Sequence, residues 1–109
     1  MNFLAHAYLS GGNKKILVGN FIGDFVKGRQ QLLKYDTLIA KGIELHRQID
    51  AFTDNHPVVT ESKKRLRPKY RHYAGVIVDV YYDHFLANRW NEYHPQPLAV
   101  FAEEVYETI

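Results

Sequence analysis

Residues 38–55, LIAKGIELHRQIDAFTDN, decide the fold because they form one amphipathic helical pattern. At 3.6 residues per turn, charged side chains gather on one face and large apolar side chains form a stripe opposite. The stripe consists of Leu38, Leu45, Ile49 and Phe52. His46, Asp50 and Thr53 lie between the two faces, on a side that points partly inward. Because an unpaired buried ion is costly, this side must line a polar cavity or face a compensating cation.

The rest of the chain also has helical periodicity, and strand signals are weak. Asn13 and Asp36 are suitable N-caps for two helices. Pro57 suits the first turn of another helix, and Pro68 is expected to end it. The segment 70–91 is apolar nearly all round, which is typical of a central, buried helix. We expect an all-α, single-domain bundle of about five to six helices, with helical segments near 2–9, 14–26, 36–55, 57–67, 70–91 and 98–108.

Composition excludes several classes of protein. The chain has 109 residues, enough for one domain with a modest core. It has no cysteine, which excludes disulfides, thiolate metal sites and cysteine nucleophiles. No apolar run approaches the roughly 18 residues that span a membrane, and the N-terminus does not resemble a secretory signal. We therefore expect a cytoplasmic protein with no membrane partner.

Acidic and imidazole side chains fall on inward-leaning faces of different predicted helices. These residues are Asp24, His46, Asp50, Asp79, Asp83 and His6. Several carboxylates that converge in one bundle repel one another strongly, and a divalent cation relieves this repulsion. Nitrogen and oxygen ligands without sulfur suit Mn, Fe, Mg or Zn, and helical bundles can hold such sites. The spacing leaves one alternative open, a solvated network in which Arg47 or Arg71 neutralises the acids.

The segment 63–71, KKRLRPKYR, concentrates positive charge, since six of its nine residues are basic. These are Lys63, Lys64, Arg65, Arg67, Lys69 and Arg71. The segment is either a solvated helix end that complements the helix dipole or a docking patch for an anionic partner. The chain has a formal net charge of only +2 and no nucleic-acid-binding motif. An acidic protein is therefore at least as suitable a partner as a nucleic acid, and we expect no nucleic acid.

Four blocks occur in an order that is characteristic of one family. They are MNFLAH at residues 1–6, GNFIGDFVKG at 19–28, HRQIDAFTDNHP at 46–57 and DVYYDHFLANRW at 79–90. Together they resemble the acyl carrier protein phosphodiesterase family, also called holo-acyl carrier protein hydrolase. The resemblance covers nearly the whole chain. Members of this family are longer, so the chain is expected to be the N-terminal part of a longer fold.

The resemblance implies an all-helical, HD-like fold, related to the HD-domain metal phosphohydrolases. It also implies manganese-dependent hydrolysis of the phosphodiester that joins 4'-phosphopantetheine to a serine of holo-acyl carrier protein, within fatty acid biosynthesis. The products would be the apo carrier and free 4'-phosphopantetheine. No histidine of this chain is followed directly by aspartate. The ligand set of ordinary HD enzymes is therefore not carried over.

The resemblance and the inward faces together suggest a role for each candidate residue. A divalent metal, manganese by the resemblance, would be held by Asp24, His46, Asp50 and Asp79. Asp83 would be a further ligand or an acceptor that orients an imidazole. His84 or His6 would protonate the departing serine oxygen. Arg47 would hold a phosphate oxygen, although the helical wheel turns it toward solvent.

Other interpretations predict different behaviour. The chain could act on another phosphoester, such as a nucleotide. It could be a non-catalytic helical module that binds an acidic protein through residues 63–71, or an inactive fragment whose acids are neutralised by arginines. An exposed apolar face on the last helix would favour a homo-oligomer. The sequence leaves open whether one metal ion or two would bind.

Overall fold

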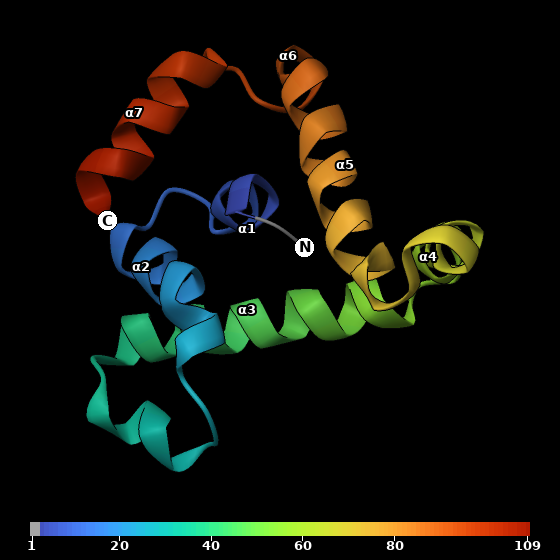
Figure 1. Cartoon of the computed structure of the whole chain (residues 1–109). Helices are drawn as coiled ribbons and strands as arrows, with labels where there is room; N and C mark the ends of the chain where they lie inside the picture. The colour runs from blue at the N-terminus through green and yellow to red at the C-terminus, as the bar shows by residue number, and fades with distance from the viewer. Residues whose placement is uncertain (1–2) are drawn as a thin grey trace.

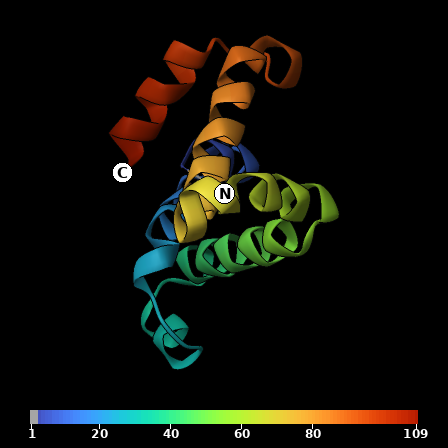
Figure 2. The same ribbon diagram turned by 45° about the vertical axis from the view of Figure 1, so that its right-hand side comes forward.

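In the computed structural model, which describes residues 3–109, one long helix is the base on which the others rest (Figure 1). This base is α3, which α2 crosses from above, and α1 lies between α2 and α5. Helix α4 folds back beside the end of α3 (Figure 2). The helices are α1 (Phe3–Leu9), α2 (Lys14–Ile22), α3 (Thr37–Asn55), α4 (Pro57–Tyr70), α5 (Ala74–Asn88), α6 (Trp90–Tyr93) and α7 (Leu98–Thr108). Short 3₁₀ segments are Gly23–Phe25, Gln30–Lys34 and Arg71–Tyr73.

The predicted all-α class is confirmed. Within residues 3–109 there are six helices of seven residues or more, one single-turn helix and no strand. Both predicted N-caps are present: Asn13 accepts hydrogen bonds from the first turn of α2, and Asp36 accepts one from Leu38 in α3. None of the described helices has the length and apolar character needed to cross a membrane.

Two glycines allow α2 and α3 to cross with their backbones in contact. A Cβ atom at Gly19 would overlap the carbonyl oxygen of Ile39, and a Cβ at Gly42 would overlap that of Ile16. Each added Cβ would also lie 2.9 Å from the Cα atom of the other glycine. Any side chain at either position would therefore push the two helices apart. This close approach places the residue after Gly19 directly against α3.

The buried side of α3 differs from the predicted apolar stripe. Ile43 is fully buried, and His46 and Ile49 are buried beside it, whereas Phe52 is 73 % exposed. The side that carries His46 faces the crossing helix α2, because the contact is at Gly42. The stripe was therefore right at Ile49 and wrong at Phe52, since the crossing point, and not hydrophobicity alone, decides which side is covered.

Two predicted boundaries in the second half are wrong. Pro68 does not end its helix, because α4 continues to Tyr70. A proline removes one backbone donor, and the exposed helix continues past that loss. It ends instead at Arg71, whose φ of 52° is left-handed and rare for a non-glycine residue. The predicted single helix over 70–91 is accordingly divided into a 3₁₀ turn, α5 and α6.

Helix α5 is also not buried all round. Ala74 and Val78 are buried, whereas Val76, Val80 and Phe85 are more than half exposed. Among the described residues, α5 packs against α1 and α4, and these cover one side. The apolar composition of the segment was recognised correctly. Its burial was not, because composition does not show which neighbours are present.

A small aromatic core joins the last helices to the first. Trp90 is buried, and its ring centroid lies 4.7 Å from that of Phe101 in α7. The Trp90 indole donates a hydrogen bond of 2.7 Å to the carbonyl oxygen of Gln96. Ala7 of α1 completes the buried cluster. The half-buried side chains packed around it are Leu4, Tyr8, Leu17, Leu86, Leu98 and Val105.

Candidate metal centre

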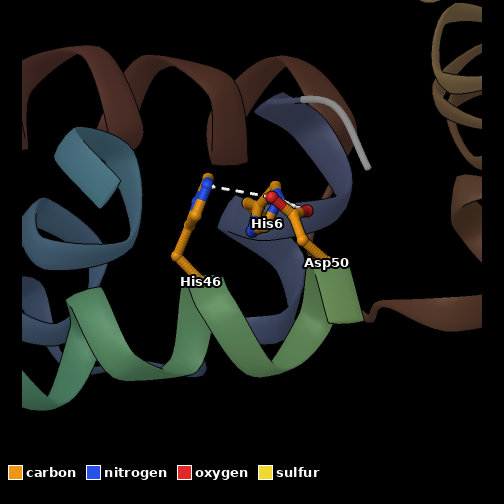
Figure 3. Close-up of side chains that lie close together, drawn as sticks. All are labelled: His6, His46 and Asp50. Carbon is orange, nitrogen blue, oxygen red and sulfur yellow. Dashed lines mark hydrogen bonds and ion pairs between the residues drawn. The ribbon is translucent and has the colours of Figure 1, made fainter. Parts of the chain in front are cut away.

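Two histidines and an aspartate from α1 and α3 form one polar cluster (Figure 3). The Nε2 atom of His6 lies 3.0 Å from one carboxylate oxygen of Asp50, and Nε2 of His46 lies 3.1 Å from the other. One potential ligand atom from each residue lies within 4.8 Å of the others. The two imidazoles stack with centroids 4.1 Å apart. The carboxylate of Asp50 therefore lies across the Nε2 edges of two nearly parallel, buried rings.

The sequence accounts for how α3 contributes two of these groups. His46 and Asp50 are one helical turn apart, so both side chains leave the same side of α3. The end of α2 makes room for the His46 ring at Gly23, where an added Cβ would approach the ring Cδ2 atom to 2.7 Å. Asp24 follows in the 3₁₀ turn, and its carboxylate oxygen lies 2.9 Å from Nε2 of His46. A glycine–aspartate pair thus brings a second carboxylate to the same imidazole.

The protonation tendencies within the cluster suit a cation. Burial lowers the pKa of His6, and the neighbouring His46 lowers it further. Burial acts to raise the pKa of Asp50, but nearby hydrogen bonding and positive charge, including both imidazoles, bring its pKa below the usual value. A neutral imidazole and an ionised carboxylate are the forms that bind a metal. The donor set of two nitrogens and carboxylate oxygens fits a divalent ion of the Mn, Fe or Zn type.

Asp79 of α5 belongs to the surroundings of the cluster. It is half-buried, and burial raises its pKa. The negative charge of Asp50 acts in the same direction. The predicted role of Asp79 as a metal ligand stays a prediction.

Asp83 has a different task. Its two carboxylate oxygens accept hydrogen bonds of 3.0 Å from the backbone N–H groups of Leu4 and Ala5, at the start of α1. Helix α1 carries His6, so Asp83 anchors the helix that supplies one of the imidazoles. Acceptors at a helix N-terminus satisfy donors that have no partner within the helix.

Two other predicted site residues have their described contacts outside the cluster. His84 is exposed and shares a hydrogen bond of 3.1 Å with Asn88 of the same helix. Arg47 donates hydrogen bonds to the carbonyl oxygens of Val26 and Gly28, which fixes the segment after the 3₁₀ turn of Asp24. The predicted roles of His84 as proton donor and Arg47 as phosphate ligand stay predictions.

The basic segment on α4 is largely exposed. Lys64, Arg65 and Arg67 are exposed, whereas Lys63 is half-buried and forms an ion pair of 3.1 Å with Asp54. Arg65 lies 3.7 Å from Glu61. Because exposed ion pairs are weak, most of this positive charge remains accessible to a partner.

The cluster can be reached from outside the protein. Asp24 and Asp50 have side chains that are 72 % and 33 % exposed. From the other side, a cavity of about 500 Å³ between α1, α2 and α7 includes His6 in its lining. The cavity is otherwise mainly apolar, with Phe21 and Phe101 among its lining residues. A small ligand can therefore approach the cluster without unfolding it.

The structure brings together some predicted residues and adds others. His46, Asp50 and Asp24 meet as expected, while His6, predicted as a proton donor, lies among the potential ligands. Asn20, which contacts His6, was not predicted as a site residue. The sequence signal was its place on the inward side of α2, three residues before Gly23.

Comparison with known proteins agrees with the blocks quoted above. The family model described as acyl carrier protein phosphodiesterase matches residues 1–109. An acyl carrier protein phosphodiesterase of Enterobacter sp. (strain 638) is 40 % identical over 110 residues, covering 100 % of this chain and 56 % of the relative. The protein of the same name from Escherichia coli (strain K12 / DH10B) is 37 % identical over 113 residues, covering 100 % of this chain and 58 % of the relative.

A third relative, from Salmonella agona (strain SL483), is 40 % identical over 102 residues, which are 93 % of this chain and 52 % of the relative. No solved structure gives a significant match. The chain therefore belongs to the acyl carrier protein phosphodiesterase family. It spans between 52 % and 58 % of the length of these relatives.

Proposed function

We propose that this member of the acyl carrier protein phosphodiesterase family binds a divalent metal ion at His6, His46 and Asp50, and hydrolyses the phosphodiester between 4'-phosphopantetheine and a serine of acyl carrier protein. The observation that carries the proposal is the cluster itself: three potential ligands from two helices, in a chain that matches the family over its whole length. The products are apo-acyl carrier protein and 4'-phosphopantetheine.

Each residue of the centre has a proposed task. His6, His46 and Asp50 would hold the ion, and Asp24 is close enough to His46 to join them. Asp79 of α5 would be a further ligand. When bound, a divalent metal activates water and neutralises charge on the phosphate oxygens. The donor set accepts several metals, and we propose manganese on the strength of the sequence resemblance.

The proposed partner is an acidic carrier protein, which would dock on the basic segment 63–71. The exposed residues Lys64, Arg65 and Arg67 support this proposal, because complementary charge speeds encounter and favours the correct partner. An acyl carrier substrate would place the protein in the cytoplasm and in fatty acid metabolism. Exposed apolar side chains on α5 and α7, such as Phe85 and Tyr106, support a homo-oligomer.

The proposal is tested by incubating the chain with holo-acyl carrier protein and Mn²⁺, with the Escherichia coli relative assayed in parallel. Mass spectrometry should show loss of the 4'-phosphopantetheine group from the carrier and its appearance in solution. Asp50→Ala should abolish release, whereas the exposed control His72→Ala should retain it. Absence of release, while the relative is active under the same conditions, would contradict the proposed reaction for this chain.

A second set of measurements separates the alternatives. Hydrolysis of nucleotides or simple phosphodiesters without release from the carrier would indicate another phosphoester substrate. Carrier binding that survives chelation and Asp50→Ala, but weakens when Arg65 and Arg67 are changed to Glu, would indicate a non-catalytic binding module. The proposed enzyme requires both the metal ligands and the basic segment.

A further inference from the structure

We propose that Asn20 is a positioning residue that fixes the tautomers of both histidines in the cluster, so that each imidazole offers the lone pair of its Nε2 atom to one shared point. The inference rests on the proposed metal centre and deepens it. It assigns a role to a buried, uncharged amide. Asn20 is 1 % exposed and lies on α2, next to the glycine at which α2 crosses α3.

The hydrogen bonds of Asn20 determine which way its amide points. The Nδ2 atom donates to the carbonyl oxygen of His6 over 2.9 Å and to the hydroxyl oxygen of Ser10 over 2.8 Å. A carbonyl oxygen can only accept, so the amide nitrogen must be on that side. Ser10 in turn donates to the same carbonyl oxygen of His6. The amide oxygen of Asn20 must therefore be on the opposite side, toward the His6 ring.

The orientation of the amide determines the proton position on His6. The Oδ1 atom of Asn20 lies 2.6 Å from Nδ1 of His6. Because an amide oxygen only accepts, the proton in this hydrogen bond belongs to Nδ1 of His6. In a neutral imidazole the other nitrogen, Nε2, then has the free lone pair. This Nε2 is the atom that points toward Asp50.

The backbone of the same residue determines the proton position on His46. The carbonyl oxygen of Asn20 lies 2.9 Å from Nδ1 of His46. It can only accept, so Nδ1 of His46 also carries a proton, and Nε2 is the atom left to bind a cation. One residue thus orients two imidazoles, the first through its side chain and the second through its main chain.

The consequence is an arrangement that suits a cation. Both Nε2 atoms face carboxylate oxygens over distances of 2.9 to 3.1 Å, from Asp50 and Asp24. A carboxylate only accepts, so at this range each Nε2 atom either carries a proton or shares a cation with the carboxylate oxygens, and a metal ion would take the place of that proton. Metal-binding histidines commonly donate their second ring N–H to a carbonyl or carboxylate, which fixes the ring and its tautomer. Asn20 supplies this partner to both rings.

The test begins with the metal-free chain in the presence of a chelator. Long-range ¹H–¹⁵N NMR spectra show which ring nitrogens of each histidine carry a proton. Nδ1 should carry a proton in both His6 and His46. In Asn20→Leu, the side-chain acceptor is lost, so His6 should change to a mixture of tautomers, whereas His46 should keep its Nδ1–H form because its acceptor is backbone. If Asn20 had a merely structural role, its substitution would not change the proton position on His6 while leaving that on His46 unchanged.

Metal titration gives the second readout. Asn20→Leu should weaken Mn²⁺ binding by about 10- to 100-fold. Asn20→Asp retains an acceptor oxygen for Nδ1 of His6 but loses the donor to the His6 carbonyl oxygen. It should therefore keep Nδ1 of His6 protonated and bind Mn²⁺ more tightly than Asn20→Leu. The control is Asn13→Ala, which removes the cap of the same helix but should leave both tautomers and the Mn²⁺ affinity unchanged.

Specific results would overturn the inference. One is an Nδ1 atom without a proton in either histidine of the unmodified chain. The other is equal behaviour of Asn20→Leu and Asn20→Asp, with both variants normal or both impaired. If Asn20→Leu does not fold, the unmodified chain and Asn20→Asp decide the question. None of these measurements uses acyl carrier protein, so the inference can fail while the proposed reaction stands, and the reverse.

Discussion

Two regions of the protein differ in the side chains that they bury. One is the crossing, formed by α1, α2 and α3, and the other is the arm, formed by α5, α6 and α7. The crossing buries polar groups, including His6, Asn20 and His46, and among the described residues every buried side-chain nitrogen or oxygen has a hydrogen-bond partner. The arm exposes large apolar groups, such as Val80 and Phe85. The polar centre is therefore held by contacts within the described residues, and the apolar face of the arm is where further packing could occur.

The largest expected effect on stability comes from changing a glycine to alanine, and the two regions should respond differently to this change. Gly42→Ala places a methyl group against the backbone of α2, so the helices must separate and the free energy of unfolding should fall by about 3 kcal/mol. Gly75→Ala, at the start of α5, meets its nearest neighbour, the Lys63 side chain, at 3.8 Å. This change should stabilise the chain by about 0.5–1 kcal/mol, because alanine is the better helix former.

Urea denaturation of both variants tests this difference in sign. A loss of stability at position 75 as large as at position 42 would show that the two regions are packed equally tightly. Gly12→Ala serves as a further control, because nothing lies within 4 Å of the added methyl group and φ is not left-handed there.

The second expected effect concerns histidines. A metal ion that binds only the folded chain stabilises it by about 2.7 kcal/mol at 100 times its dissociation constant. His46→Ala in the crossing should abolish the stabilisation by Mn²⁺, because it removes one of the three potential ligands. His84→Ala in the arm should leave it unchanged. Thermal unfolding with and without Mn²⁺ provides the measurement, and equal responses of the two variants would remove the distinction between the regions.

The third prediction concerns the contact that joins the regions. Asp83→Ala removes the acceptors for two backbone N–H groups at the start of α1 and should cost about 1 kcal/mol of stability. It should also weaken metal binding, because α1 carries His6. Asp54→Ala removes an exposed ion pair with Lys63 and should change stability by less than about 0.5 kcal/mol. Unchanged metal affinity in Asp83→Ala would show that α1 needs no anchor from the arm.

The smallest effect is a dependence on pH. Burial lowers the pKa of His6 below its ordinary value of 6.5. Between the two pKa values the unfolded chain binds a proton that the folded chain does not, so stability rises with pH across this window and is lost as pH falls below about 6.5. The slope should flatten in His6→Gln. Urea denaturation of the metal-free chain from pH 5 to pH 8 checks this prediction, and a slope that does not depend on His6 would contradict it.

Local features of the fold could be predicted, because they depend on neighbouring residues in the sequence. The caps Asn13 and Asp36 follow from residue type, because both side chains readily accept hydrogen bonds from the first turn of a helix. The shared side of His46 and Asp50 follows from helical spacing. The division of the 70–91 segment could not be predicted, because it depends on the left-handed backbone at Arg71, a residue type that rarely adopts this conformation.

The sequence placed His6 on an inward face, but it could not show that His6 lies against Asp50, and it did not identify Asn20 as a site residue. Asn20 lies against α3 because Gly19 and Gly42 let the backbones of α2 and α3 touch. A short helical pattern does not show which helix it will cross. The same limit explains why the contact between the Asp83 carboxylate and the start of α1 was not predicted. The role of Asp83 as a ligand or as an acceptor for an imidazole stays a prediction.

Metal content tests the central claim most directly. The chain is purified, loaded with Mn²⁺, freed of excess ion by gel filtration and measured by elemental analysis beside His46→Ala and His84→Ala. The account predicts about one equivalent of manganese or more in the unmodified chain and in His84→Ala, and a background level in His46→Ala. Background metal in all three proteins, or equal metal in all three, would contradict a metal centre at His6, His46 and Asp50.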